Sequence, residues 1–510
     1  MNYSISNPIN LKLTILLLLM VTGLMGQMYI PADPYNLIFL EKQSFSNIDS
    51  AISTQIRPVF YPFNKRNKLF LKARTEFFYN SDAPNLENMS DRWPGKGLGY
   101  FGSIHAEYRL QLFTITAEPF YFINQNKEFV EARRLEKFSY LNDNRPHLDK
   151  PYISYGIREF QAYLHHKGIG CGLSNANMWF GPGLHTSPTM TNNTIGFPHV
   201  FVGTVEEKRL TKWSINSRYV FSSLKQNKEY DTYYTAGVFS ASYDSDPKIS
   251  IGLVREAITG GLSKNDSIKW QAAALAIFSG LLIPLDNEEF RNTWSHDDHA
   301  GSIFVSLIFK QTKLMVFFEF AKTQSPSVLR TLLVYPDHGI ATNFGFRKYG
   351  LFGEDKLILA GEYFQNFNSR SSHRIIKGSG DWYIREQYNF NSYEGRRWAA
   401  HSGADSDDFL LMAGWVGKKF SILPSVNYER HRVVRQPSEI DIDAIEGFVN
   451  KLPETKLEFR LDLRYKYNSY KFNLYYEREL TLNLAHSNNS RSGNVLWFGI
   501  EKDLNLFSNW

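Results

Sequence analysis

The stretch "KLEFRLDLRYKY", from Lys456 to Tyr467, alternates strictly between charged and apolar side chains. Because successive side chains of a β-strand point to opposite faces, this pattern predicts a strand with one charged face and one apolar face. The alternation lasts for twelve residues, whereas strands of soluble sheets usually have about 5–6 residues. Twelve residues suit a strand that crosses a bilayer at a tilt.

The same alternation recurs along the chain. It is present in "LFLKARTEFFY" from Leu69 and in "HAEYRLQL" from His105, and it resumes after the two-residue turn at Asn468. Further stretches place two strands around a short polar turn, as in "ASYDSDPKISIGL", "LIFKQTKLMVFFEF" and "AGWVGKKFSILPSV", while other polar segments are long, such as residues 366–407. Short turns that alternate with long loops indicate an antiparallel transmembrane β-barrel with a charged lumen and an outer surface that contacts membrane lipid.

The length of the chain predicts the size of this barrel. About 480 residues remain after a signal peptide, and at about 26 residues per strand with its loops they predict about 18 strands, within a range of 16 to 20. We assign the barrel to residues 67–510 and a short helical segment at the periplasmic mouth to residues 27–66, where "PYNLIFLEKQSFSNIDSAISTQIRP" does not alternate.

Residues 1–26 resemble a secretory signal peptide, because Lys12 precedes an apolar run that is too short to span a membrane. Together with the barrel pattern, this predicts the outer membrane of a Gram-negative cell. The net charge of +6 is small for 510 residues and gives no reason to expect nucleic acid as a partner. The single cysteine, Cys171, excludes an intrachain disulfide. We expect a monomer without a cofactor.

One motif lacks the alternation of the predicted strands: "MWFGPGLHTSPTMTNN", from Met178 to Asn193. Gly181-Pro182-Gly183 suits a type II turn in which Gly183 takes the positive φ. The structural interpretation is a tight turn beside an interfacial tryptophan, and the residues alone favour it. The functional interpretation is a sugar site, in which aromatic rings stack on sugar rings and neutral polar groups bind hydroxyls. Its residues would be Trp179, Phe180, Thr186, Asn192 and Asn193.

This motif, with "GFPHV" close behind it at residues 196–200, resembles the central motif of the capsule-assembly Wzi family. "HAGSIFVSLIFKQTKLMVFFEFAKTQ" from His299 and "SYEGRRWAAHSGADSDDFLL" from Ser392 resemble later parts of the same family. The resemblance implies an outer-membrane β-barrel that binds exported capsular or exopolysaccharide and supports capsule assembly or attachment at the surface.

Other functions remain open. An open diffusion channel is the main alternative. A hydrolase is less favoured, because His296, His299 and the acidic residues Asp297 and Asp298 fall in an expected surface loop, as do His401 and the acidic residues Asp405, Asp407 and Asp408. Without a positioned serine or a third ligand at metal-site spacing, we expect solvated loop charge, no catalytic residue and no metal. Arg430 and Arg432 share one strand face, where they either line the lumen or attract acidic sugars.

Overall fold

The computed structural model describes residues 29–30, 32, 34–46, 53–60, 68–134, 138–139, 141–143, 150–224, 230–263, 298–323, 339–366, 382–383, 385–431 and 453–504. The predicted signal peptide lies outside these residues. Within the described ranges, no helix has the length and apolar character that crossing a membrane requires.

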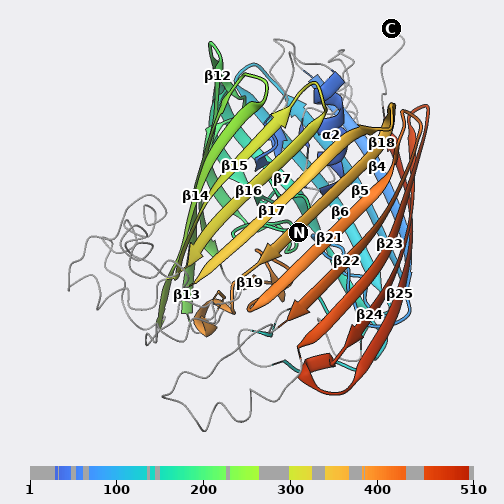
Figure 1. The fold of residues 1–510 in the computed structure, drawn as a ribbon. Coiled ribbons are helices and arrows are strands. Elements are labelled where there is room, and N and C mark those ends of the chain that lie inside the picture. Colours follow the sequence, from blue (N-terminus) through green and yellow to red (C-terminus); the bar gives the residue numbers. More distant parts are fainter. Residues whose placement is uncertain are drawn as a thin grey trace, which may run out of the picture.

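Long tilted strands form the wall of the molecule (Figure 1). They are β4 (Lys68–Asn80), β5 (Gly97–Arg109), β6 (Phe113–Asn124), β7 (Tyr152–His166), β8 (Ile169–Ser174), β10 (His199–Thr204), β11 (Lys208–Leu210), β12 (Trp213–Leu224), β13 (Tyr230–Tyr243), β14 (Lys248–Ser263), β15 (Asp298–Phe309), β16 (Leu314–Thr323), β17 (Ile340–Leu351), β18 (Glu354–Gln365), β21 (Ser406–Val416), β22 (Phe420–His431), β23 (Glu454–Tyr467), β24 (Tyr470–Leu482) and β25 (Ser490–Asp503).

These strands pair antiparallel in a closed ring, because the last strand, β25, pairs with the first, β4. Both β10 and β11 pair with β12, so they are two pieces of one interrupted strand, and the barrel has 18 strands. The predicted fold class and strand number are confirmed.

The alternation in the sequence corresponds to the two faces of the wall. In β23, Glu458 and Asp462 are buried toward the lumen, whereas Phe459 and Tyr465 are exposed on the outer surface. In β5, His105 and Glu107 are likewise buried while the intervening side chains are more exposed. The charged lumen and apolar outer surface are therefore as predicted.

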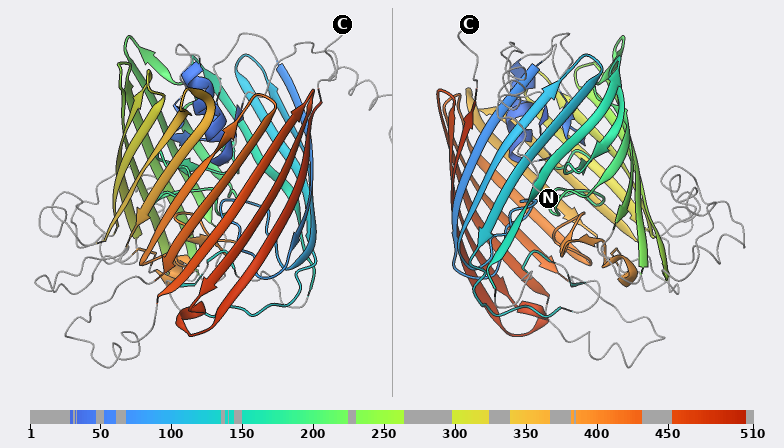
Figure 2. Two further views of the ribbon diagram at one scale, coloured as in Figure 1. Left: turned by 45° about the vertical axis from the view of Figure 1, so that its right-hand side comes forward. Right: turned by 180° about the vertical axis from the view of Figure 1, so that it is seen from behind.

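The two ends of the barrel differ. At one end the strands join through short turns, such as residues 352–353 between β17 and β18 and residues 468–469 between β23 and β24. At the other end the connections are long, such as residues 125–151 and 366–405. The start of β4 and the end of β25 both lie at the short-turn end (Figure 2), which in outer-membrane barrels faces the periplasm.

Among its described residues, the segment predicted to be helical contains one helix, α2 (Pro34–Ser46), which has proline at its first position as helices favour. It lies inside the short-turn end of the barrel (Figure 2). Glu41 accepts hydrogen bonds from Arg347 Nε at 2.7 Å and from the Tyr349 hydroxyl at 2.8 Å, both on β17. Residues 56–60 are strands instead: β2 (Ile56–Arg57) and β3 (Val59–Phe60), the latter paired with β1 (Tyr29–Ile30).

Candidate functional site

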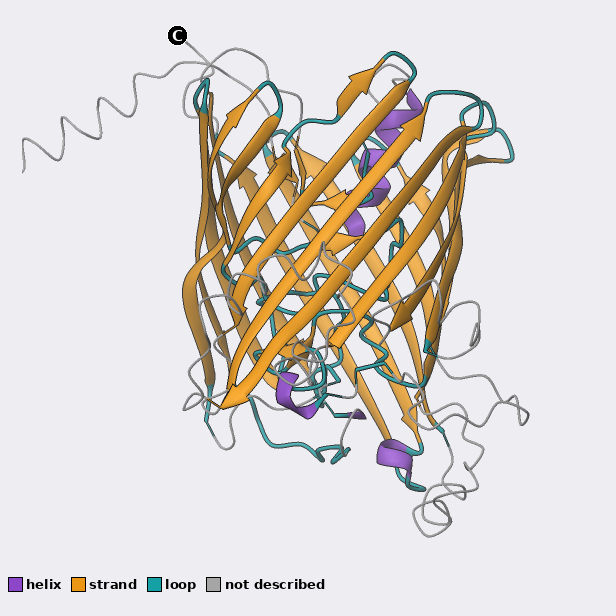
Figure 3. Ribbon diagram, turned by 90° about the vertical axis from the view of Figure 1, so that its left-hand side faces the viewer, coloured by secondary structure: helices purple, strands orange, loops and turns teal. Residues whose placement is uncertain are grey.

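Loop segments enter the barrel and fill part of its lumen (Figure 3). We call residues 53–60, 81–96, 175–198 and 385–405 the plug. They include the short strands β9 (Trp179–Phe180), β19 (Ser392–Tyr393) and β20 (Arg396–Arg397), and the 3-10 turn η3 (Glu386–Tyr388). A second 3-10 turn, η4 (Leu484–His486), lies between β24 and β25. Most plug side chains are buried, although the composition of the plug is polar.

The aromatic pair of the motif forms a strand inside the lumen. β9 pairs with β2, so that Trp179 lies opposite Arg57 and Phe180 lies opposite Ile56. The guanidinium of Arg57 lies 4.2 Å from the centre of the Trp179 ring. Both aromatic side chains are fully buried. The expectation that Trp179 lies in the interfacial aromatic belt is therefore wrong, because its loop folds inward.

The turn itself differs from the type II prediction. Gly181 has a positive φ of 98°, and Gly183 is not among the described residues with positive φ. Gly183 is needed for space instead, because a Cβ there would lie 2.1 Å from the backbone oxygen of Thr186. The two glycines are therefore required for different reasons: Gly181 for its backbone conformation and Gly183 for the close approach of another backbone atom.

Buried arginines and a buried carboxylate bind the polar backbone groups of this turn. Arg57 Nη2 donates to the carbonyl oxygen of Gly183 at 2.6 Å, and Arg347 Nη2 donates to that of Pro182 at 3.0 Å. The carboxylate of Glu362, on β18, accepts backbone N–H groups from the next three residues, 184, 185 and 186, at 2.6, 3.2 and 2.9 Å. The barrel wall thus binds the motif through its main chain.

The polar residues that follow the turn bind other plug segments. Asn193 Nδ2 donates to the Arg397 carbonyl at 3.0 Å, and its Oδ1 accepts from Asn142 Nδ2 at 2.9 Å. Thr191 Oγ1 donates to the carbonyl of Ala399 at 2.8 Å. Residues 186–193 are nearly inaccessible to solvent. In this arrangement these contacts hold the plug together, and whether any of these side chains binds sugar stays a prediction.

A cavity of about 1540 Å³ reaches from the short turns to the plug. Of the predicted ligand-binding residues, Asn192 lines it. Neighbouring lining residues of the plug are Asn88, Asn177 and His185, the aromatic part of the lining includes Phe39, Tyr475 and Trp497, and lysines near the short turns include Lys356, Lys418, Lys419 and Lys466. The cavity therefore offers amides, ring faces and positive charge together.

The two predicted arginines do not line the lumen together. Arg430 lies on the same face of β22 as the exposed Tyr428, which is the outer face, and its Nε donates to Asp407 at 2.9 Å. The lumen-lining interpretation is wrong for Arg430, because Tyr428 points outward and side chains two positions apart in a strand lie on the same face. Arg432 lies outside the described residues.

The predicted surface cluster at His401 is inside the molecule. His401, Asp405 and Asp408 are buried there, because residues 385–405 fold into the lumen and the Asp408 side chain faces it from β21. Asp407 also belongs to β21, but it has the outward phase of Phe409 and is buried by its pairing with Arg430. The assignment of these residues to a solvated loop is therefore wrong. Of the other cluster, Asp298 begins β15 and is buried and His299 is partly buried, while His296 and Asp297 lie outside the described residues.

His401 is one of four side chains that converge where the plug meets the wall. Its Nε2 lies 3.1 Å from Asp408 Oδ2 and 3.4 Å from Glu429 Oε1. His185, from the motif loop, lies with Nε2 3.3 Å from Asp408 Oδ1. Burial alone would lower the pKa of His401, but the neighbouring carboxylates Asp408 and Glu429 raise it to about 10. One nitrogen or oxygen from each of the four lies within 4.8 Å of the others, so together they could hold a metal.

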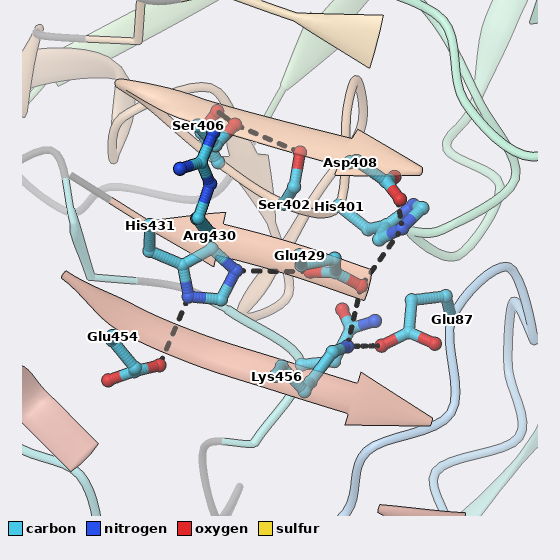
Figure 4. A network of polar contacts seen from close by, with 12 residues as sticks. Glu87, His401, Ser402, Ser406, Asp408, Glu429, Arg430, His431, Glu454 and Lys456 are labelled. Carbon is cyan, nitrogen blue, oxygen red and sulfur yellow. Dashed lines mark hydrogen bonds and ion pairs between the residues drawn. The ribbon is translucent and has the colours of Figure 1, made fainter. Parts of the chain in front are cut away.

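Glu429 connects this cluster to a wider network of charges (Figure 4). Its carboxylate contacts Lys456 Nζ at 2.8 Å and His431 Nε2 at 3.0 Å, and His431 in turn contacts Glu454. Arg134, from the long loop after β6, extends the network from Glu454 at 2.6 Å to Asp143 at 2.7 Å. Sequence spacing does not reveal this network, because its members come from two strands and from loops that are far apart along the chain.

Comparisons with known proteins support the fold. No family model matches the sequence, and no curated protein matches it. Among solved structures the chain is similar to Wzi, an outer membrane protein involved in group 1 capsule assembly in Escherichia coli and described as a carbohydrate-binding β-barrel, with a TM-score of 0.59 and 11% identity over 93% of this chain and 99% of that one.

The chain therefore has the fold of an outer-membrane β-barrel. It also matches OccD3 of Pseudomonas aeruginosa, with a TM-score of 0.42 and 10% identity over 86% of this chain and 91% of that one. The outer membrane channel DcaP of Acinetobacter baumannii matches with a TM-score of 0.36 and 9% identity over 86% of this chain and 97% of that one.

Proposed function

We propose that this barrel binds exported polysaccharide at the outer membrane and supports assembly or attachment of a capsule, as a monomer. The plug carries the proposal. A lumen filled by hydrogen-bonded segments suits retention of a polymer better than free diffusion, and the neighbour that shares the fold over nearly its whole length is described as carbohydrate-binding.

The cavity between the plug and the short turns is the candidate binding surface. Its volume of about 1540 Å³ exceeds the 300–1,000 Å³ typical of pockets for small ligands, so it has room for several sugar rings. Asn192 lines the cavity with an amide whose Nδ2 donates to the Asn88 carbonyl at 3.0 Å, and whose buried Oδ1 has no hydrogen-bond partner among the described residues. Lysines near the short turns favour an acidic polysaccharide.

Binding rather than catalysis is also part of the proposal. The hydroxyls nearest to the histidine cluster in sequence are those of Ser402 and Ser406, which lie 3.0 Å apart, and the Ser406 hydroxyl also donates to the Gly403 carbonyl at 3.0 Å. These contacts use the hydroxyls within their own turn. Turnover of a lipid or peptide substrate that is lost on replacing His401 would argue for a hydrolase instead.

The test is retention of labelled capsular polysaccharide by the purified protein in detergent, where both ends of the barrel are accessible. Asn192→Ala should weaken retention at least several-fold without changing barrel assembly. Asn494→Ala is the matched control, because it makes the same chemical change on the outer face, where Asn494 accepts from the Tyr476 hydroxyl at 2.9 Å.

Conductance in a planar bilayer separates the two main alternatives. The plugged barrel should be silent. Steady stepwise conductance from the wild-type protein, with no retention of polysaccharide, would replace the proposal with a diffusion channel.

A further inference from the structure

We propose that the four converging side chains form a binding site for one divalent transition-metal cation, which ties the plug to the barrel wall. The ligands are His185, His401, Asp408 and Glu429. The site is a different one from the proposed polysaccharide surface, and it does not require that surface to be correct.

Distances between the ligand atoms fit such a cation. Zinc bonds of about 2.0–2.1 Å in a tetrahedron place the ligand atoms about 3.4 Å apart. His401 Nε2 lies 3.1 Å from Asp408 Oδ2 and 3.4 Å from Glu429 Oε1, while His185 Nε2 lies 3.3 Å from the other oxygen of Asp408, Oδ1. One ligand atom from each of the four residues lies within 4.8 Å of the others, so the side chains must draw closer to complete a tetrahedral shell.

Without a cation, ion pairs and hydrogen bonds hold these groups together. His401 Nε2 lies between Asp408 Oδ2 and Glu429 Oε1, and Glu429 Oε1 also contacts Lys456 Nζ at 2.8 Å. His185 Nε2 lies 2.9 Å from Asn427 Nδ2. A metal needs deprotonated ligands, so a bound cation would replace the proton that His401 shares with the carboxylates. Asn427 Nδ2 donates to Asp408 Oδ1 at 2.6 Å, and such an outer contact orients a ligating carboxylate.

The charge balance permits a cation. Asp408 and Glu429 are both buried carboxylates. Glu429 also pairs with Lys456 and His431, so Asp408 is the carboxylate whose ionic partners are the two histidines of the site.

A second group of converging carboxylates is not proposed as a metal site. Glu87, Glu429 and Glu458 also converge, but Lys456 contacts all three and therefore already serves as their cation. Two imidazoles with two carboxylates are a ligand set for zinc and similar ions, and not for magnesium or calcium, which prefer oxygen ligands.

The position of the site gives the cation a role. His185 comes from the motif loop and His401 from the loop before β21, while Asp408 on β21 and Glu429 on β22 are paired across the wall. A single ion would therefore join two separate plug segments to two neighbouring strands. His185 lines the cavity, which provides the path by which an ion reaches the site.

Metal binding is tested on full-length protein without a histidine tag, purified in detergent and treated with chelator. Added Zn²⁺ should bind with one equivalent per chain, measured by elemental analysis and by competition with a chromogenic chelator. Co²⁺ in its place should give the intense visible absorption of a four-coordinate site. Wild-type protein that takes up neither ion would overturn the proposal without any variant.

Variants then locate the ion. His401→Gln should weaken zinc binding at least 100-fold and abolish the cobalt spectrum. His105→Gln is the matched control, because His105 is a buried histidine that also lies near two carboxylates, those of Glu107 at 3.9 Å and Glu118 at 3.4 Å, but without a second imidazole. Equal zinc binding by the two variants would refute the assignment. If His401→Gln does not assemble, His185→Gln, on the partly exposed ligand, carries the same test.

Discussion

Glu362→Gln tests how the wall holds the motif. The carboxylate accepts the backbone N–H groups of Leu184 and His185 on Oε2 and that of Thr186 on Oε1, which also accepts from Asn343 Nδ2 at 3.2 Å. A glutamine amide has one oxygen, so in either orientation its NH₂ group faces two donors. Each buried donor left without an acceptor costs about 1–3 kcal/mol. We therefore expect Glu362→Gln to weaken the attachment of the motif to the wall by about 2–6 kcal/mol.

Hydrogen exchange of the three amides measures this loss directly. A cost of about 2–6 kcal/mol predicts exchange that is about 30-fold to 10⁴-fold faster. The matched control is Glu256→Gln on β14, because Glu256 accepts a bond from the Tyr234 hydroxyl at 3.0 Å that an amide oxygen can also accept. Unchanged exchange at residues 184–186 in Glu362→Gln, in a barrel that still shifts on gels when heated, would refute the reasoning.

Three further changes have defined outcomes. Gly183→Ala places a Cβ 2.1 Å from a backbone oxygen and should abolish the heat-modifiable barrel band on gels, whereas Gly156→Ala, with its nearest contact at 3.7 Å, should not. Asn193→Ala removes three buried side-chain hydrogen bonds and should cost the plug about 2–4 kcal/mol, seen as faster proteolysis of plug loops in an intact barrel. Burial would raise the pKa of Asp143, but its arginine partners lower it to about 2. Its contribution of about 2 kcal/mol is therefore complete above about pH 4 and is lost as the pH falls toward 2, and Asp143→Asn should remove this acid-dependent step from the unfolding midpoint.

The wall of the barrel could be predicted from the sequence, and its contents could not. Period-2 alternation as in residues 456–467 is dictated by two different environments on the two faces of a strand, so it is readable in the chain alone. The turns at residues 244–247 and 417–419 follow for the same reason, because alternation stops there.

The plug could not be predicted from the sequence, because the lumen that surrounds it is polar. A segment such as residues 186–193 has the composition of a loop in water, and the same composition suits a loop that exchanges water for hydrogen bonds inside a charged barrel. For that reason His401 and Asp408 were expected in solvent, and their meeting with His185 could not be read from spacing. The positive φ of Gly181 was assigned to Gly183, because either glycine permits a turn and only the packing decides between them.

The pairing of β2 with β9 has a consequence for biogenesis. Residues 56–57 precede the first strand of the wall and yet lie against residues 179–180 inside it, while the ring closes only when β25, the last strand, reaches β4. A closed barrel offers no easy route for the folded plug to enter. The plug must therefore be in place before β25 pairs with β4. A chain whose plug packs badly would then stall as an open sheet with two unpaired edges, and such a variant would be found as a degraded protein in the cell and not as a leaky one.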